Sequence, residues 1–416
     1  MKFYSIDSCR LCKSKNLLKR LSLTPTPWAD DYFKNKKLQK SPKEIPLDLY
    51  ECQDCKHVQL KHIINAEEIY LNYSYETEST LGLGEHFIET ADYTSNLVEG
   101  NDGLVIDIGS NDGILLKYYK QKGFKILGID PMPGIAKKAT ENGVETLPIF
   151  FNSKSASDVL SKFGKAKIIS SNNLVADTDD LDDFIDGVNK ILDDDGIFFF
   201  ETFYFYLQVK NFVWDFTYHE HYSYFLIRPL KEYFLKKGLE IIELKTNLTK
   251  GGSIRIVLQK KGASRKINYL VNEFIKKEEE EGFYNGTAIT EYGKKINKGK
   301  IDFNINFEKI ISKTKNIAGF GASATSTTLI YHYNLGDKLK YLVDDFYMKH
   351  NTFSPGYEIP VYETKKIYED MPEYVVILAW RYKDKIISKN KNYLDKGGKF
   401  IIPLPHFKII DSNNFE

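Results

Sequence analysis

The stretch WDFTYHEHYSYF at residues 214–225 gathers side chains that can move protons. Two of them are His219 and His221, and histidine is the side chain whose unperturbed pKa best suits proton transfer near neutral pH. Tyr218 and Glu220 complete the YHEH core of the stretch. A packed aromatic corner would contain the same residue types. The stretch therefore predicts either a proton-transfer site or a buried cluster, depending on its position relative to a binding site.

All four cysteines of the chain fall within its first 55 positions. They form two CxxC pairs, Cys9 with Cys12 and Cys52 with Cys55. The opening residues lack the apolar core of a secretory signal, so we expect a cytoplasmic protein without disulfides. Paired CxxC motifs then predict a zinc ion held by four thiolates, with no position open for water and hence a structural role. Four reduced thiols, or His57 or His62 replacing one sulfur, are the alternatives.

A glycine turn lies between two apolar runs of the sequence. In VIDIGSNDG, Asp107 ends a predicted strand, and Gly109 and Gly113 permit a tight turn before a predicted helix. The spacing is not the GxGxxG of dinucleotide sites, because Ser110 and Asn111 stand where the second glycine would be. A single nucleoside with a cationic tail suits this turn better, which indicates S-adenosylmethionine. The alternative is a turn that only packs a helix on a strand.

Acidic residues around this turn are the predicted contacts to the cofactor. Asp130 ends the next apolar run, ILGID, where a carboxylate can accept both hydroxyls of a ribose. We expect Asp107 or Asp112 to face the sulfonium or amino group. The full predicted cofactor-binding set is Asp107, Gly109, Asn111, Asp112, Gly113, Asp130 and Asn173.

The elements that must position these residues alternate along the chain. Residues 103–131 read as strand, turn, helix and strand, and further strands are predicted at 165–175 and 195–202 around a helix at 180–194. This alternation favours a mostly parallel, doubly wound sheet, with residues 239–262 adding an antiparallel pair. YHEH follows the strand GIFFFET, at the carboxyl edge where α/β enzymes bind substrates.

A second α/β unit begins at residue 316, after charged helical stretches at 263–315. Its turn GFGASA has Ala324 in place of the third glycine of a dinucleotide fingerprint, and no redox motif accompanies it, so a substrate-facing cap is expected. The chain of 416 residues predicts several domains. We predict boundaries at 1–75 for a zinc-binding domain, 76–262 for the domain that binds S-adenosylmethionine, 263–315 for connecting helices and 316–416 for a C-terminal α/β substrate-associated domain.

The charge balance, 58 basic against 57 acidic residues, gives no bias toward nucleic acid or anionic lipid. No apolar run approaches the roughly 20 residues of a membrane helix. We therefore expect no nucleic-acid partner and no membrane, and a monomer or homodimer.

Together the paired CxxC, DIGSNDG, YHEH and the late GFGASA, LVDD and SPGYEIPV resemble the nucleotide-sugar C-methyltransferases of deoxysugar biosynthesis. The resemblance covers essentially the whole chain. It implies a zinc-binding N-terminal domain, a class I methyltransferase domain with a Rossmann-like doubly wound sheet, and a second, C-terminal Rossmann-like α/β domain. It also implies proton abstraction beside a 4-keto group, formation of an enolate, and methyl transfer from S-adenosylmethionine to carbon.

The resemblance also implies the roles of individual residues. His221 would be the base, and Tyr218 and Glu220 would polarise or protonate the enolate oxygen. Tyr75, in the tyrosine-rich YSYETEST, would reach into the active site. O- or N-methylation of a related sugar nucleotide, and a non-catalytic sugar-nucleotide-binding protein, are the alternative functions.

Two departures from the family pattern bear on the substrate. Asp177 stands where the family usually has histidine, and Thr325 and Thr327 stand where it usually has lysine and asparagine. A lysine in a glycine turn contacts anionic substrate, so its loss leaves the identity of the nucleotide sugar open.

Overall fold

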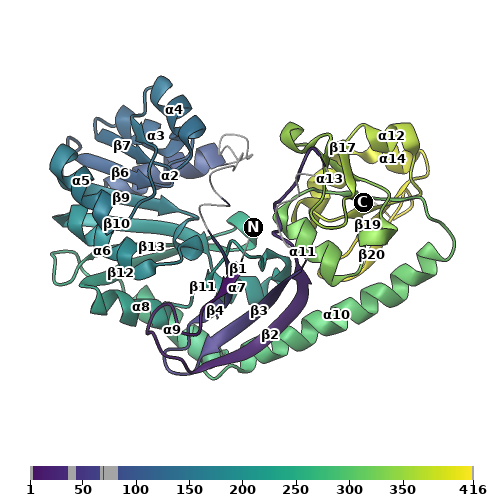
Figure 1. The fold of residues 1–416 in the computed structure, drawn as a ribbon, viewed down its shortest axis with the longest axis horizontal. Helices are drawn as coiled ribbons and strands as arrows, with labels where there is room; N and C mark the ends of the chain where they lie inside the picture. Colours follow the sequence, from purple (N-terminus) through teal and green to yellow (C-terminus); the bar gives the residue numbers. More distant parts are fainter. Residues whose placement is uncertain (1–2, 36–43, 66–68, 70–82, 415–416) are drawn as a thin grey trace.

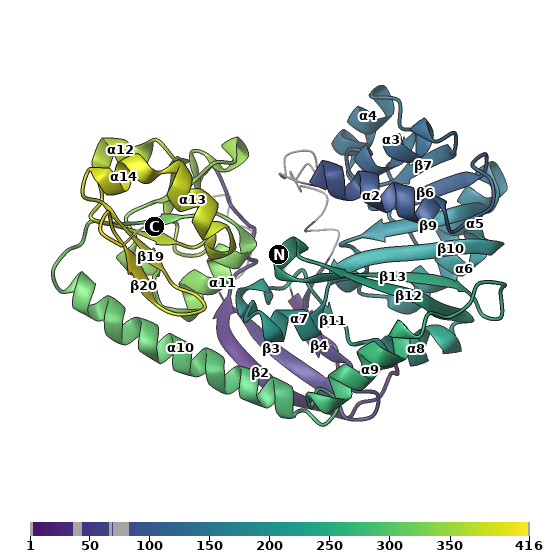
Figure 2. The same ribbon diagram turned by 180° about the vertical axis from the view of Figure 1, so that it is seen from behind.

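The computed structural model describes residues 3–35, 44–65, 69 and 83–414. Two α/β units stand side by side, the blue and teal one built around residues 83–262 and the green and yellow one around residues 316–414 (Figure 1). Beneath both run the purple N-terminal strands and the long helix α10 (Thr287–Ile311), and the reverse view shows the same arrangement (Figure 2). The N-terminal strands thus lie below the junction of the two units.

The N-terminal sheet has four antiparallel strands in the order β11-β4-β3-β2. Its strands are β2 (Leu17–Thr26), β3 (Ile45–Cys52), β4 (Val58–Leu60) and β11 (Ser223–Tyr224). A separate antiparallel pair joins β1 (Phe3–Ser5) to β5 (His62–Ile64). Strand β11 directly follows YHEH in the chain, and Ser223 pairs with Gln59 of β4. The N-terminal sheet therefore holds one end of the YHEH segment.

The larger sheet follows the order β8-β7-β6-β9-β10-β13-β12. Its strands are β6 (Leu104–Ile108), β7 (Lys125–Ile129), β8 (Thr146–Leu147), β9 (Ala166–Asn172), β10 (Leu192–Phe203), β12 (Leu239–Asn247) and β13 (Ser253–Lys260). The first five strands in this list pair in parallel, and β13 runs antiparallel to both of its neighbours. This confirms the predicted class I methyltransferase sheet and its antiparallel pair.

Both faces of this sheet are covered, so its central strands are apolar on both sides. All five residues of β6 are buried, with Val105 packing toward one face and Ile106 toward the other. Helices α2 (Leu83–Ser95), α3 (Ile114–Gln121) and α4 (Pro133–Glu141) share the first core. Helices α5 (Ser153–Phe163), α6 (Leu181–Ile191) and α8 (Ile227–Lys236) share the second.

The C-terminal unit contains a second, mostly parallel sheet in the order β16-β17-β15-β14-β18-β19-β20. Its strands are β14 (Ile317–Phe320), β15 (Leu342–Asp344), β16 (Thr352–Phe353), β17 (Pro360–Glu363), β18 (Tyr374–Ile377), β19 (Lys399–Ile402) and β20 (Lys408–Ile410). The helices of this unit are α11 (Ala324–His332), α12 (Lys366–Asp370), α13 (Lys383–Lys389) and α14 (Lys391–Asp395). The predicted second Rossmann-like unit is thereby confirmed.

Two further helices accompany the strands beneath both units. Helix α9 (Leu270–Glu280) leads into α10, and the short α7 (Phe205–Lys210) follows β10. In the described segments, no helix is long and apolar enough to cross a membrane. The domain boundaries drawn from the sequence stay predictions.

Side chains of the C-terminal unit fasten the segment that leads into YHEH. The indole of Trp380 donates to the carboxylate of Asp215 at 2.9 Å, and the hydroxyl of Thr328 donates to the carbonyl of Thr217 at 3.0 Å. Asp215 is fully buried. Residues 214–225 therefore belong to the first α/β unit and are bonded to both the N-terminal sheet and the C-terminal unit.

Candidate active site

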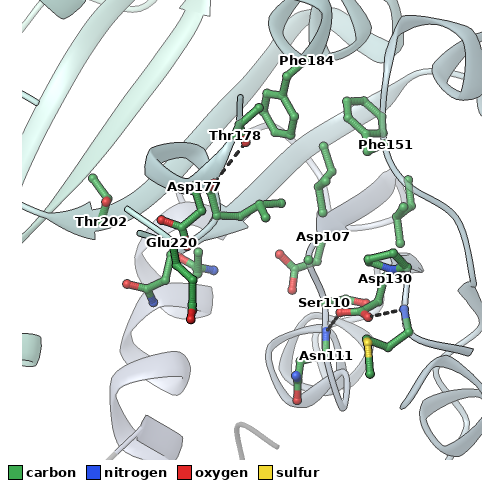
Figure 3. Close-up of a pocket in the computed structure, with 18 of the residues that line it drawn as sticks. Asp107, Ser110, Asn111, Asp130, Phe151, Asp177, Thr178, Phe184, Thr202 and Glu220 are labelled. Carbon is green, nitrogen blue, oxygen red and sulfur yellow. Dashed lines mark hydrogen bonds between the residues drawn. The ribbon is translucent and has the colours of Figure 1, made fainter. Parts of the chain in front are cut away.

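A cavity of about 300 Å³ opens at the carboxyl ends of the parallel strands β6, β7, β9 and β10. This volume is at the lower end of the range for small-molecule sites. In Figure 3, Asp130 and Asn111 lie on one side of the cavity and Asp177, Glu220 and Thr202 on the other. The residues predicted for the cofactor and those predicted for proton transfer thus line one cavity.

The Asp130 carboxylate forms the centre of the first side. One oxygen accepts from the backbone amide of Asn111 at 2.9 Å and the other from that of Met132 at 3.0 Å (Figure 3). These two bonds fix the carboxylate while leaving further lone pairs on each oxygen, as a pair of ribose hydroxyls requires. Gly109 reaches the turn with φ of 77°, a conformation that favours glycine.

Asp107 also lines the cavity and accepts from the Ser170 hydroxyl at 2.6 Å. Burial raises the pKa of Asp107 to about 7, and the nearby carboxylates of Asp130 and Asp112 add to the effect. A cationic ligand would favour the ionised form of this carboxyl group. Phe151 and Phe184 form an apolar wall of the cavity, with ring centroids 5.3 Å apart (Figure 3).

Two members of the predicted cofactor set do not line the cavity in the described part of the chain. Asp112 accepts from the backbone amide of Ile114 at 3.3 Å, at the start of α3. Gly113 has φ of 76°, and a Cβ there would stand 2.8 Å from Val144. Both residues shape the turn, whereas Asn173 lines the cavity, with φ of 55°.

The second side of the cavity carries Tyr218, Glu220 and His221. Nδ1 of His221 lies 2.8 Å from the carbonyl oxygen of Phe216, and a carbonyl can only accept, so Nδ1 carries the proton in the neutral ring. Nε2 is then the nitrogen with the free lone pair. The ring centroids of Tyr218 and Phe203 lie 4.0 and 4.5 Å from the centroid of the imidazole. Burial among these rings lowers the pKa of His221 to about 3.

Glu220 is anchored from the N-terminal unit. The indole of Trp28 donates to its carboxylate at 2.6 Å, across 192 positions of sequence. Burial raises the pKa of Glu220 to about 7, and the charge of Asp30 contributes. Near neutral pH this carboxyl group can therefore either donate or accept a proton.

The other residues that the sequence singled out lie in different settings. His219 is buried but does not line the cavity, and its Nε2 lies 3.3 Å from the carbonyl oxygen of Pro46. Tyr75 lies outside the described residues. Asp177 lines the cavity, as does Lys250, which the sequence patterns did not single out. The one available signal for Lys250 was its place before two glycines in a predicted hairpin.

Thr325 and Thr327 lie in α11 and bond to the protein itself. The Thr327 hydroxyl donates to the carbonyl of Ala29 at 2.7 Å, and the Thr325 hydroxyl lies 3.0 Å from that of Ser323. Thr327 therefore joins the C-terminal unit to the N-terminal segment that carries Trp28.

The four cysteines come together outside the cavity lining. Their sulfur atoms all lie within 4.8 Å of one another, with Cys9 to Cys55 and Cys12 to Cys52 both at 3.5 Å. A tetrahedral zinc ion with Zn–S bonds of about 2.3 Å holds its sulfurs about 3.8 Å apart. The cluster fits such an ion with all four positions taken by protein, as the sequence predicted for a structural metal.

Three family profiles match consecutive parts of the chain. They are described as "Putative zinc binding domain" at residues 9–70, "Methyltransferase domain" at 88–244 and "C-methyltransferase C-terminal domain" at 248–405. The C-methyltransferase NovU of Streptomyces niveus is 27% identical over 411 residues, 98% of each chain.

Solved structures resemble the chain more remotely. The PH0226 protein of Pyrococcus horikoshii OT3 is 14% identical, covering 47% of this chain and 100% of its own with a TM-score of 0.37. The magnesium protoporphyrin IX methyltransferase ChlM of Synechocystis PCC 6803 is 13% identical, covering 47% and 92% with a TM-score of 0.33.

The three family profiles follow the order that the sequence motifs predicted, and the relative matches from end to end. The four-cysteine cluster agrees with zinc, and the sheet and its glycine turn agree with S-adenosylmethionine as the cofactor. The chain therefore combines a zinc-binding domain, an S-adenosylmethionine-dependent methyltransferase domain and a C-methyltransferase C-terminal domain, and it is an S-adenosylmethionine-dependent C-methyltransferase.

Proposed function

We propose that this enzyme methylates a carbon atom next to the keto group of a nucleotide-activated 4-keto-deoxysugar. The observation that carries the proposal is one cavity lined both by Asp107 and Asp130 and by Tyr218, Glu220 and His221. Carbon methylation requires a base that removes a C–H proton close to the methyl donor, and this cavity offers both. The sugar nucleotide rests on the family resemblance, and NovU is a named C-methyltransferase of matching length.

The cofactor is proposed to lie on the Asp130 side, where it supplies an electrophilic methyl group. Asp130 would hold the ribose hydroxyls, and Asp107 would face the cationic end. Asn111, Gly109 and Asn173 would line the remaining contacts. Because this side is formed by strand ends of a rigid parallel sheet, the cofactor would be held in a defined orientation.

Proton removal is assigned to Nε2 of His221. The Nδ1–H···O bond to Phe216 fixes the tautomer and the ring plane, so the free lone pair needs no rearrangement before it accepts the proton. Tyr218 and Glu220 would hydrogen-bond the carbonyl oxygen as negative charge develops on it. Since burial disfavours the imidazolium, proton transfer would depend on strong stabilisation of the enolate.

The direct test is incubation with S-adenosylmethionine and a panel of nucleotide-linked 4-keto-6-deoxyhexoses in deuterated water. We expect a product heavier by one methyl group, which replaces the hydrogen removed from the carbon, and deuterium at that same carbon in substrate that has not been methylated. Exchange of that carbon-bound hydrogen should also occur without a methyl donor, because enolisation precedes methyl transfer. Methyl transfer from a substrate that gains no carbon-bound deuterium when the methyl donor is omitted would indicate an oxygen or nitrogen acceptor. Binding without either reaction would indicate a sugar-nucleotide-binding protein.

The affinity for S-adenosylmethionine is expected to rise about tenfold between about pH 6 and 8. Burial raises the pKa of Asp107 to about 7, and a cationic ligand binds its ionised form better than its protonated form. The dissociation constant should therefore fall as pH rises through this range, with release of a proton on binding. Calorimetric titrations in buffers of different ionisation enthalpy measure both quantities.

The Asp107→Asn variant should bind S-adenosylmethionine more weakly and without this pH dependence. Asp102→Asn, at an exposed position just before β6, is the matched control and should behave as wild type. An Asp107→Asn variant that keeps the wild-type pH dependence would show that another group titrates.

A further inference from the structure

Lys250 lies in the turn between β12 and β13 and lines the cavity together with Asp177, Glu220 and His221. Among the described residues that line the cavity, it is the one lysine or arginine. The same lining contains five carboxyl groups, those of Asp107, Asp130, Asp177, Asp179 and Glu220. Lys250 is therefore the cation that the described lining offers to a substrate.

The backbone holds Lys250 in an unfavourable conformation. Its φ is 52°, in the left-handed region that residues with a Cβ seldom adopt. The next two carbonyl groups accept hydrogen bonds that fix the turn. The Asn211 side chain donates to the carbonyl of Gly251 at 2.9 Å, and the Tyr204 amide donates to that of Gly252 at 3.0 Å. The Gln208 side chain donates to Gly252 as well, at 3.2 Å. Such enforced strain is characteristic of functional sites.

The side chain of Lys250 ends in an ammonium group that the described residues leave uncommitted. Within the part of the chain that the structure describes, it makes no hydrogen bond or ion pair. Burial lowers the pKa of Lys250, while the charges of Asp177 and Glu201 act in the opposite direction. Lys250 is half-buried at the cavity, and an ammonium group placed there without a protein partner is available to a ligand.

The proposed reaction requires a positive charge in the cavity, close to His221. His221 is a weak base in its aromatic surroundings, since burial lowers its pKa to about 3. An enolate would also stand among several carboxyl groups. A weak base can remove a carbon-bound proton only if the resulting enolate is strongly stabilised.

We propose that the ammonium group of Lys250 is a catalytic group that binds the substrate carbonyl oxygen and stabilises the enolate. In this step the carbon-bound proton passes to Nε2 of His221, and the electron pair of the broken C–H bond enters the enolate, whose oxygen becomes negative. Lys250 keeps its proton and supplies the opposing charge. This role rests on the proposed function, because it requires a keto substrate.

The experiment compares Lys250→Asn with wild type in the deuterium-exchange assay, using the nucleotide-linked keto sugar on which wild type is active. Asparagine is neutral and tolerates a positive φ, so the variant should fold. Loss of one preorganised group at an oxyanion lowers kcat about 10²–10³-fold, and we expect this fall in both exchange and methyl transfer. Binding of S-adenosylmethionine should remain close to wild type.

Two further variants separate charge from structure. Lys250→Arg keeps a cation and should retain part of the exchange rate. Lys245→Asn is the matched control, because Lys245 lies on β12 in an exposed ion pair with Glu89 and should leave the exchange rate unchanged.

Each outcome decides a separate claim. Exchange by Lys250→Asn at the wild-type rate would overturn the inference, as would a rise in KM with unchanged kcat, which would mark Lys250 as a binding contact only. If Lys250→Asn fails to bind S-adenosylmethionine, Lys250→Arg is compared with the uncharged Lys250→Gly. Equal exchange rates for these two variants would overturn the inference. Loss of exchange in the glycine variant alone would support it. Absence of exchange in wild type across the panel would instead refute the proposed function.

Discussion

Replacing His221 by alanine is expected to lower the rates of carbon-bound deuterium exchange and of methyl transfer together, by about 10²–10⁴-fold. The imidazole is the one group of the YHEH segment that reaches the cavity with a defined tautomer and a nitrogen lone pair left over. If proton removal generates the nucleophile, both reactions pass through the same enolate. Their losses should therefore be equal within error.

The measurement follows exchange by mass spectrometry or NMR, with the keto sugar in deuterated water and with the methyl donor omitted or added. Binding of S-adenosylmethionine serves as the test of folding, since its predicted contacts lie on the opposite side of the cavity. Any loss of stability from the missing bond to Phe216 would appear in the melting temperature, separately from the exchange rate.

His219→Ala is the matched control for this experiment. His219 stands two positions away in the same segment but is buried outside the cavity, beside the carbonyl of Pro46. We expect a lower melting temperature with exchange largely retained. If His221→Ala keeps exchanging deuterium, the base would be another group, and Glu220 would be the next to test because burial raises its pKa to about 7.

Local sequence patterns predicted those parts of the site that are local in the structure. Asp107, Gly109 and Asp130 belong to one strand-turn-helix-strand unit, whose apolar runs and glycines determine where the turn and the strand ends lie. The same locality explains why Asp112 and Gly113 were included with them. They are neighbours in sequence and fall in the turn just before α3, but the cavity lining passes from Asn111 to Ile114 without them.

Local sequence patterns could not predict the contacts between segments that are distant in the sequence. The bond from Trp28 to Glu220, the pairing of β11 with β4 and the approach of Lys250 to the cavity all depend on how separate units pack. None of them has a periodicity or a motif of its own. The YHEH segment could therefore be recognised as chemically suited, whereas the structure was needed to see what holds it.

The zinc-binding unit provides much of the support for the YHEH segment. Cys52 ends β3, which pairs with β4, and β4 pairs with β11 directly after YHEH. The amide of Leu60 also donates to the carbonyl of Tyr222 at 3.0 Å. A metal outside the cavity can thus affect catalysis through strand pairing.

Removing zinc is accordingly expected to abolish methyl transfer while S-adenosylmethionine still binds. Structural zinc sites contribute about 10–16 kcal/mol in small domains, as much as the whole stability of many proteins. The N-terminal sheet should not persist without the ion, and β11 and the Trp28–Glu220 bond would be lost with it. The cofactor side is formed by β6, β7 and β9, which belong to a different sheet.

Metal analysis should first find about one zinc per chain. Chelator-treated protein and the Cys52→Ser variant can then be followed by hydrogen exchange at residues 45–64 and 214–225, by methyl transfer and by cofactor binding. We expect both segments to lose protection together with activity, and readdition of zinc to restore the chelated wild type but not the variant. If metal-free protein stayed protected and active, the thiols alone would hold the sheet. If both segments opened while activity survived, residues 214–225 would be held in place by the bonds that Trp380 and Thr328 make to them, independently of β11.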